Sequence, residues 1–332
     1  MGRFTTFIRC GPMVDFTILG AGVAGLAMAT ELSGRGAAVR LIDPGGPPGA
    51  HACSWWAGGM LAPDCEGALA EPAVVHHGRA AAGWWDAQGA EVTRNGTLVV
   101  ALGRDRSELK TFARRVPGAE RVDGAAIAAL EPDLEGRFSQ GLFLSDEGHL
   151  DPRAALACLH GGLSVAETGD LEGQVIDCRG LAARANLTDL RGVKGEMVVV
   201  RSPDVRLSRP VRLLHPRFPL YIVPRAGGVF MLGATQIESG DRTRATVRSV
   251  MELLNAAYAL HPAFGEAELL EIGVDARPAF PDNQPRIRHT ADRVYANGLF
   301  RHGFLLAPAL ARMTADLMLN GTPPEDWYED HR

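Results

Sequence analysis

The sequence predicts an α/β fold in which a Rossmann-like nucleotide-binding domain is interrupted by a mixed, β-rich domain. The first observation behind this prediction is a complete strand–helix–strand unit with a glycine-rich turn in residues 14–43. The second is that strands able to extend the same sheet return at residues 174–180 and 293–298, with β-rich sequence between them. The nucleotide-binding domain is therefore expected to be discontinuous.

The glycine-rich unit has a physical role for each glycine. Residues 14–19 are predicted to form a short buried strand, and an apolar helix pattern follows Gly25. The turn between them reads Gly20-Ala21-Gly22-Val23-Ala24-Gly25. Gly20 allows the tight turn, Gly22 lets a pyrophosphate approach the backbone, and Gly25 lets the helix pack on the strand. The helix N-terminus offers free N–H groups and a partial positive charge to the phosphates.

An acid completes this unit at the end of its second strand. Asp43 follows Gly25 by 18 residues, close to the spacing of about 20 expected for a ribose-binding carboxylate. It would accept hydrogen bonds from the adenosine ribose and repel a 2′-phosphate, which disfavours NADP. The alternative is a glycine-rich turn that binds no ligand. NAD dehydrogenases normally continue directly into further strand–helix repeats, so the interrupted order is typical of large FAD proteins.

Composition and charge narrow the class of protein. The 332 residues are 46% hydrophobic and 22% charged, which is ordinary for a soluble chain of one large or two smaller domains. A net charge of −5 without a dense Lys/Arg stripe disfavours a nucleic-acid partner. Five scattered cysteines without a C-x-x-C pair predict a reduced, cytoplasmic protein without a structural metal. No membrane segment is expected, residues 1–12 are expected to be disordered rather than a signal, and Met13 is a candidate start.

The remaining elements follow from periodicity and turn residues. Helices are predicted over residues 72–88, 105–115, 123–130, 152–160, 243–259 and 303–320. Strands are predicted at residues 96–102, 141–145, 174–180, 196–200, 219–224, 228–234, 268–274 and 294–296. Asp151 as N-cap and Pro152 at the first helical position mark one start, and Gly240-Asp241 is expected to cap another.

Four stretches together carry a resemblance to a known family. They are the turn unit with Asp43, residues 54–61 (SWWAGGML), residues 221–225 with 233–235, and residues 273–278 with 298–308. On these residues the chain resembles the D-amino-acid oxidase superfamily and, within it, the glycine oxidases of thiamine biosynthesis, from about residue 14 to 320. The implied fold is of D-amino-acid oxidase type. Its FAD-binding domain would comprise residues 14–90, 140–192 and 278–332, and its substrate domain residues 91–139 and 193–277.

The resemblance implies FAD as cofactor. The residues that would bind it are Gly20, Gly22, Val23, Ala24, Gly25, Asp43, Pro44, Ser54, Ala57, Gly58, Gly59, Met60, Gly298, Arg301, His302, Gly303, Phe304 and Leu305. Some relatives attach FAD through His or Cys, but the C-terminal third has no Cys, so noncovalent FAD is expected. In relatives the helix that starts at Gly303 points its N-terminus at the flavin pyrimidine ring, where it stabilises the negative charge of the reduced ring.

The same resemblance implies how a substrate is held. Arg277 matches the carboxylate-binding arginine, whose planar fork gives two parallel hydrogen bonds. Tyr221 would add a phenolic hydrogen bond, and Arg301 would line the site beside the substrate. The alternatives are a surface ion pair for Arg277, a half-buried strand residue for Tyr221, and pairing with an acid near the flavin for Arg301. No side-chain base is predicted. Once the substrate amine is neutral, holding its Cα–H toward the flavin is enough for hydride transfer.

The expected reaction is oxidation of glycine or another small amine or D-amino acid to its imine, with oxygen as acceptor and hydrogen peroxide as product. The imine would pass to a thiazole synthase, and a homo-oligomer is one expectation for the assembly. One alternative is a dehydrogenase that passes electrons to a quinone or protein, and another is a flavin-binding subunit that needs a partner. The chain departs from relatives in its short 160–175 region and in Asp177-Cys178-Arg179-Gly180, which implies weaker FAD retention.

Overall fold

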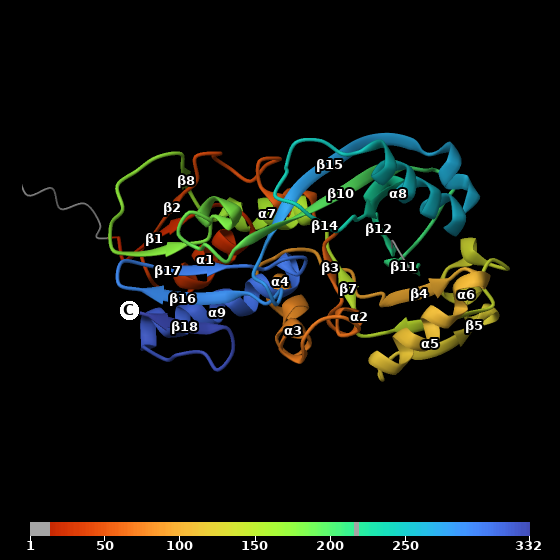
Figure 1. The fold of residues 1–332 in the computed structure, drawn as a ribbon, viewed down its shortest axis with the longest axis horizontal. Helices are drawn as coiled ribbons and strands as arrows, with labels where there is room; N and C mark the ends of the chain where they lie inside the picture. The colour runs from red at the N-terminus through yellow and green to blue at the C-terminus, as the bar shows by residue number, and fades with distance from the viewer. Residues whose placement is uncertain (1–13, 216–218) are drawn as a thin grey trace, which may run out of the picture.

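The computed structural model describes residues 14–215 and 219–332. The predicted disorder of residues 1–12 lies outside the described residues. The chain builds two large sheets, shown at the left and right of Figure 1, and a small two-stranded sheet between them. This is the α/β architecture that the sequence predicts. Within the described ranges, no helix combines the length and apolar character needed to cross a membrane.

The first large sheet is the nucleotide-binding sheet. Its seven strands have the order β18-β16-β17-β9-β1-β2-β8. Their bounds are β1 Phe16–Leu19, β2 Val39–Ile42, β8 Val165–Ala166, β9 Gln174–Asp177, β16 Arg286–Thr290, β17 Val294–Asn297 and β18 Tyr328–His331. Strand β1 lies parallel between β2 and β9, and β17 joins β9 in parallel. Strands from three distant parts of the chain therefore share one sheet, as predicted.

Helices cover this sheet and supply its core. They are α1 Val23–Gly34, α3 Pro72–Gly78, α4 Ala81–Ala87, α7 Pro152–Gly161 and α9 Gly303–Asn320. Helices α1 and α9 pack against each other, and buried side chains of both join the largest hydrophobic cluster. Asp151 caps α7 as predicted, with its Oδ1 accepting from the N–H groups of Arg153 and Ala154 at 2.8 and 3.1 Å.

The second large sheet is the β-rich domain. Its path is β14-β10-β13-β12-β11-β4-β6-β5, and β15 pairs with β10. The bounds are β4 Thr97–Ala101, β5 Glu120–Asp123, β6 Gln140–Leu144, β10 Arg191–Arg201, β11 Val211–Leu214, β12 Leu220–Arg225, β13 Val229–Gly233, β14 Ile237–Glu238 and β15 Glu268–Ala279. Helices α5 Arg106–Arg115, α6 Gly124–Leu130 and α8 Val247–Leu260 belong to the same region.

Two long strands connect the two regions. Figure 1 shows β10 and β15 running side by side from the neighbourhood of the nucleotide-binding sheet into the β-rich sheet. Their antiparallel register places Val193 opposite Arg277. The predicted domain boundaries at 192/193 and 277/278 fall inside these two strands, and the boundaries themselves stay a prediction.

Several predicted elements need correction. The single helix over residues 72–88 is two helices, because the chain turns after Gly78, where Leu305 of α9 packs so closely that a Cβ would lie 2.9 Å from it. Helix α8 begins at Val247, where the Thr246 side chain accepts from Ser249 N–H, so Gly240-Asp241 is not its cap. Strands β11, β16 and β18 were not predicted, since each is short and carries charged residues.

A short helix near the small sheet is held in place by a buried carboxyl group. Helix α2 Pro63–Glu66 follows the small sheet formed by β3 Met60–Leu61 and β7 Gly148–His149. Glu147 is 1% exposed, and its Oε1 accepts from Cys65 N–H at 2.6 Å. Burial raises the pKa of Glu147 to about 7, although the hydrogen bond from Cys65 N–H opposes the shift.

Replacing this acid should change how stability depends on pH. In the unfolded chain a Glu titrates near 4.3, whereas Glu147 in the folded protein titrates near 7. The folded state therefore binds more protons in this window, and its stability falls as pH rises from about 4.3 to 7. We expect the unfolding free energy of Glu147→Gln relative to the parent to rise by about 3 kcal/mol across that window.

Denaturant unfolding of both proteins at a series of pH values measures this difference. Other titrating groups are common to both proteins and cancel. A difference that is independent of pH would contradict the assignment.

Candidate active site

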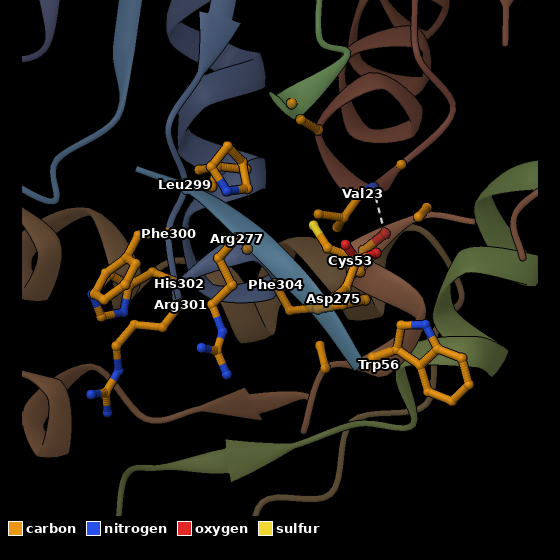
Figure 2. A pocket seen from close by; sticks show the side chains of 18 of the residues that line it. Val23, Cys53, Trp56, Asp275, Arg277, Leu299, Phe300, Arg301, His302 and Phe304 are labelled. Atoms are coloured by element: carbon orange, nitrogen blue, oxygen red, sulfur yellow. Dashed lines mark hydrogen bonds between the residues drawn. The ribbon is translucent and has the colours of Figure 1, made fainter. Parts of the chain in front are cut away.

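One elongated pocket joins the two regions. It has a volume of about 450 Å³ and runs from the β1–α1 turn to the face of the β-rich sheet (Figure 2). All the predicted site residues line it except Gly25, whose role is packing. The structure thus brings together residues from positions 20 to 305. Whether each contacts FAD or substrate stays a prediction.

The β1–α1 turn has the geometry that a pyrophosphate needs. Gly20 has a φ of +97°, and a Cβ on Gly25 would lie 1.7 Å from the Gly20 carbonyl oxygen. Gly22 is the N-cap of α1 and makes no side-chain capping bond. The nearest side-chain atom to a Cβ on Gly22 is Ser54 Oγ at 3.5 Å, and Ser54 also accepts from Val23 N–H at 3.3 Å, a bond drawn in Figure 2.

Asp43 braces the same turn. Its Oδ2 accepts from Ala21 N–H at 2.7 Å, and its Oδ1 accepts from Gly45 N–H at 2.8 Å. The carboxylate therefore lies at the mouth of the glycine turn, where an adenosine ribose is expected. Next to it, β9 ends at Asp177, three residues earlier than predicted, and Cys178, Arg179 and Gly180 line the pocket.

The segment 54–60 forms one wall with small residues. A Cβ on Gly58 would lie 2.9 Å from the Tyr221 ring, and Gly59 has a φ of +80° with Leu150 O only 2.1 Å from where a Cβ would be. Met60 begins β3 and pairs with His149. Trp56 lines the pocket beside this segment, and Trp55 lies under the Arg153 guanidinium at 4.6 Å. The glycines therefore let the segment lie between Tyr221 and the β7–α7 connection.

The opposite end of the pocket is formed by the start of α9. Gly298 has a φ of +82°, and a Cβ there would lie 2.3 Å from the Phe280 ring. His302 is the N-cap of α9 and makes no side-chain capping bond, and it is followed by Gly303, Phe304 and Leu305 along the wall. The positive end of an 18-residue helix therefore faces the pocket.

Four arginines line the pocket, and three of them have carboxylate partners. Arg179 pairs with Asp177 at 2.5 Å, Arg242 with Asp275 at 2.5 Å, and Arg301 with Glu66 at 3.0 Å. Among the described residues, no carboxylate forms an ion pair with Arg277. Its Nη1 donates to Thr235 O at 3.1 Å, and the Tyr221 side chain lies close enough to affect its pKa.

Burial lowers the pKa of the Arg277 guanidinium, Tyr221 opposes this shift, and Arg301 adds to it. Gly195 makes room for the side chain, since a Cβ there would lie 2.3 Å from Arg277 Nη2. The structure therefore holds a desolvated guanidinium in the pocket without a protein counter-ion among the described residues. That arrangement suits an anionic ligand.

Glu66 is a pocket residue that sequence reasoning missed. Its Oε1 accepts from Arg301 at 3.0 Å and from Arg212 at 3.4 Å, and its Oε2 lies 3.6 Å from His302 Nδ1. Burial would raise the pKa of Glu66, but Arg301 and Arg212 outweigh it and lower the pKa to about 2. For Arg301 the structure thus shows the acid partner of the alternative reading, and the position of this pair relative to the flavin stays a prediction. The local sequence does not single out Glu66, because Asp64 is an equally placed acid after the glycine-rich segment 54–61.

Fold and pocket together define a nucleotide-binding oxidoreductase with an inserted substrate domain. The chain belongs to the FAD-dependent oxidoreductase family, whose model matches residues 15–317. Over 311 residues it is 54% identical to a Rhizobium etli protein that carries the provisional name thiamine biosynthesis oxidoreductase ThiO, and the match covers 90% of this chain and 95% of that protein.

Other relatives are similar over most of the length of this chain. The crystal structure of glycine oxidase from Geobacillus kaustophilus matches with a TM-score of 0.77 at 25% identity, over 94% of this chain and 96% of that chain. The bifunctional protein ThiO/ThiG of Trichormus variabilis is 27% identical over 92% of this chain and 52% of its own length. The D-amino-acid oxidase type of fold is thereby confirmed.

The residues present fit the family's cofactor. The glycine turn has no side chain where a pyrophosphate would lie, Asp43 stands where a ribose would follow, and the α9 N-terminus faces the other end. FAD supplies a ring that accepts two electrons, and these residues would hold it.

The close packing at the β1–α1 turn predicts that one added methyl group lowers both stability and flavin binding. Gly25→Ala would place a Cβ 1.7 Å from backbone oxygen, so the helix must move away from the strand. We expect a loss of about 3 kcal/mol of stability together with loss of bound FAD. Gly34→Ala at the other end of α1 is the matched control, because a Cβ there meets no atom within 4 Å. It should keep the flavin and gain about 0.5 kcal/mol.

Denaturant unfolding and flavin absorbance after gel filtration measure both effects. Normal flavin content in Gly25→Ala would contradict the role given to this contact.

Proposed function

We propose that this chain oxidises glycine or another small amino acid to the imine, with oxygen reduced to hydrogen peroxide. The single observation that carries the proposal is the Arg277 guanidinium, which faces the pocket and lacks a carboxylate partner among the described residues. A half-buried cation without a counter-ion is costly, and a substrate carboxylate would supply the missing charge. The names of the relatives support an amino-acid substrate.

The residues around Arg277 have distinct roles in this proposal. Arg277 binds the carboxylate through two parallel hydrogen bonds, and Thr235 O holds one side of its guanidinium in place. Tyr221 adds a phenolic hydrogen bond at the same carboxylate. Their combined effect is to hold the substrate Cα–H toward the flavin end of the pocket, so positioning is their main contribution. Arg301 lines the site beside them.

The wider setting follows from the relatives' names. We propose noncovalent FAD, a cytoplasmic location and a role in supplying an imine for thiazole formation in thiamine biosynthesis. The name of the Rhizobium etli protein supports the pathway. The bifunctional relative ThiO/ThiG supports a hand-off to a second protein, since a ThiO-like half is fused there to another half. A homo-oligomer is part of the proposal and is tested by the mass of the purified protein in solution.

Anaerobic addition of glycine to the purified, flavin-loaded protein is the direct test. Bleaching of the flavin absorbance is expected, and readmitted air should restore it with one hydrogen peroxide formed per flavin. Slow recovery in air but fast recovery with a quinone would favour the dehydrogenase instead. An unchanged band with glycine, sarcosine and D-alanine would contradict the proposal and favour a subunit that needs a partner.

Removal of the Arg277 charge should weaken catalysis strongly. We expect Arg277→Gln to lower kcat/KM for glycine by about a hundredfold or more, because two charge-assisted hydrogen bonds are lost. Arg153→Gln is the control, since Arg153 pairs with Glu271 and does not line the pocket. Steady-state oxygen consumption measures both. A loss below tenfold for Arg277→Gln at normal flavin content would contradict the assignment.

A further inference from the structure

Glu66 controls the charge of the second arginine in the pocket. Its carboxylate is held from two sides, by Arg301 of the loop before α9 and by Arg212 of β11. The Glu66 side chain is 12% exposed and that of Arg212 is 6% exposed, so the three charges lie largely out of water. Separating a buried ion pair of this kind is costly, because each partner would remain buried without a counter-charge. Arg301 is therefore held by a carboxylate of the protein itself, which it shares with Arg212.

Arg301 lies near the guanidinium that is left for substrate. Figure 2 shows the Arg277 and Arg301 side chains extending in the same direction, from β15 and from the loop before α9. Arg301 is close enough to contribute to the lowered pKa of Arg277. If Arg301 carried a free charge, the pocket would present two guanidinium groups. Two such groups form a ready site for a ligand with two carboxylates.

We propose that Glu66 is a specificity-determining residue: by holding Arg301 it restricts the pocket to one carboxylate and excludes small dicarboxylates. The inference rests on the proposed function, because it takes Arg277 as the binding group for the substrate carboxylate. A second carboxylate entering the site must displace Glu66 from Arg301 and also faces repulsion from the Glu66 charge. Specificity then comes from an unfavourable contact with the wrong ligand as well as a favourable one with the right ligand.

The charge of Glu66 determines whether Arg301 is free to bind a ligand, because the other groups around Glu66 do not replace it. Burial lowers the pKa of His302 to about 4, so its imidazole is neutral near pH 7 and contributes no charge. Arg212 donates to Cys65 O at 3.3 Å as well as to Glu66, and it lies behind Glu66 on the β-rich side. Removing the Glu66 charge therefore frees Arg301 toward the pocket, while Arg212 keeps a backbone partner.

Binding of unreactive carboxylates to the FAD-loaded protein tests the proposal. Acetate is the monocarboxylate probe, and malonate and succinate are dicarboxylates of two lengths. Titration by flavin absorbance gives the ratio of the acetate Kd to the better dicarboxylate Kd. We expect Glu66→Gln to raise this ratio at least tenfold, which corresponds to about 1.4 kcal/mol. With substrates, the kcat/KM of iminodiacetate relative to glycine should rise in the same direction.

Two further variants make the result specific to Arg301. Glu66→Gln/Arg301→Gln should return the ratio to within about threefold of the parent value, because the freed cation is gone. Glu271→Gln removes one negative charge outside the pocket, where Glu271 pairs with Arg153, and should leave the ratio unchanged. An unchanged ratio in Glu66→Gln, or a gain that persists in the double variant, would overturn the proposal.

If the Glu66→Gln protein does not retain flavin, Glu66→Asp is tested in its place. This change keeps the charge but shortens the reach to Arg301, so a rise of about threefold is expected and no rise overturns the inference. The carboxylate titrations do not depend on turnover. A parent protein that fails to oxidise glycine yet shows the Glu66-dependent ratio would contradict the proposed reaction alone, whereas turnover of glycine with an unchanged ratio would contradict the Glu66 inference alone.

Discussion

The antiparallel pairing of β10 with β15 is the constraint on which the site depends. These two strands run together from the β-rich sheet toward the nucleotide-binding sheet, so they bring residues of the β-rich region to the pocket. Their register places Arg277 opposite Val193, and Gly195 two residues further on leaves space for the guanidinium. A side chain at Gly195 would occupy the position of Arg277 Nη2. The pairing therefore delivers a cation to the pocket and also provides the room that the cation needs.

The charges of the pocket follow a simple pattern. Three of its four arginines are matched by carboxylates, and each of these pairs ties two segments of chain together or braces a turn. Arg277 is the exception among the described residues, and it is held by a backbone carbonyl and by Tyr221 instead of an acid. The paired arginines serve the structure, whereas an unpaired and partly desolvated one has interaction energy left for a ligand. Such energy is best used to orient the reacting bond.

Sequence reasoning succeeds where the determining contacts are local. The β1–α1–β2 unit is predictable, because its glycines, strands and acid act within 30 residues of one another. Arg277, Tyr221 and the pocket that they share are predictable through the motifs of the family rather than from local contacts. The Glu66–Arg301 pair joins residues 235 positions apart, so nothing in the local sequence indicates it. Strands β11, β16 and β18 also have distant partners, since β11 pairs with β4 and β16 with β18, although β11 and β16 each pair as well with the next strand along the chain.

The state of His302 shows why the burial of a group matters as much as its identity. A histidine at the N-cap of α9 could add a positive charge where the helix dipole already points positive. Burial prevents this: it lowers the pKa of His302, and although Glu66 opposes the shift, Arg301 and Arg212 add to it. The imidazole is therefore neutral near pH 7. The positive potential at this end of the pocket then comes from the α9 N-terminus and from Arg277, whose charge persists over the whole physiological pH range. A negatively charged ring and a substrate carboxylate would thus meet fixed charges at the start of α9 rather than an imidazole that titrates between pH 5 and 8.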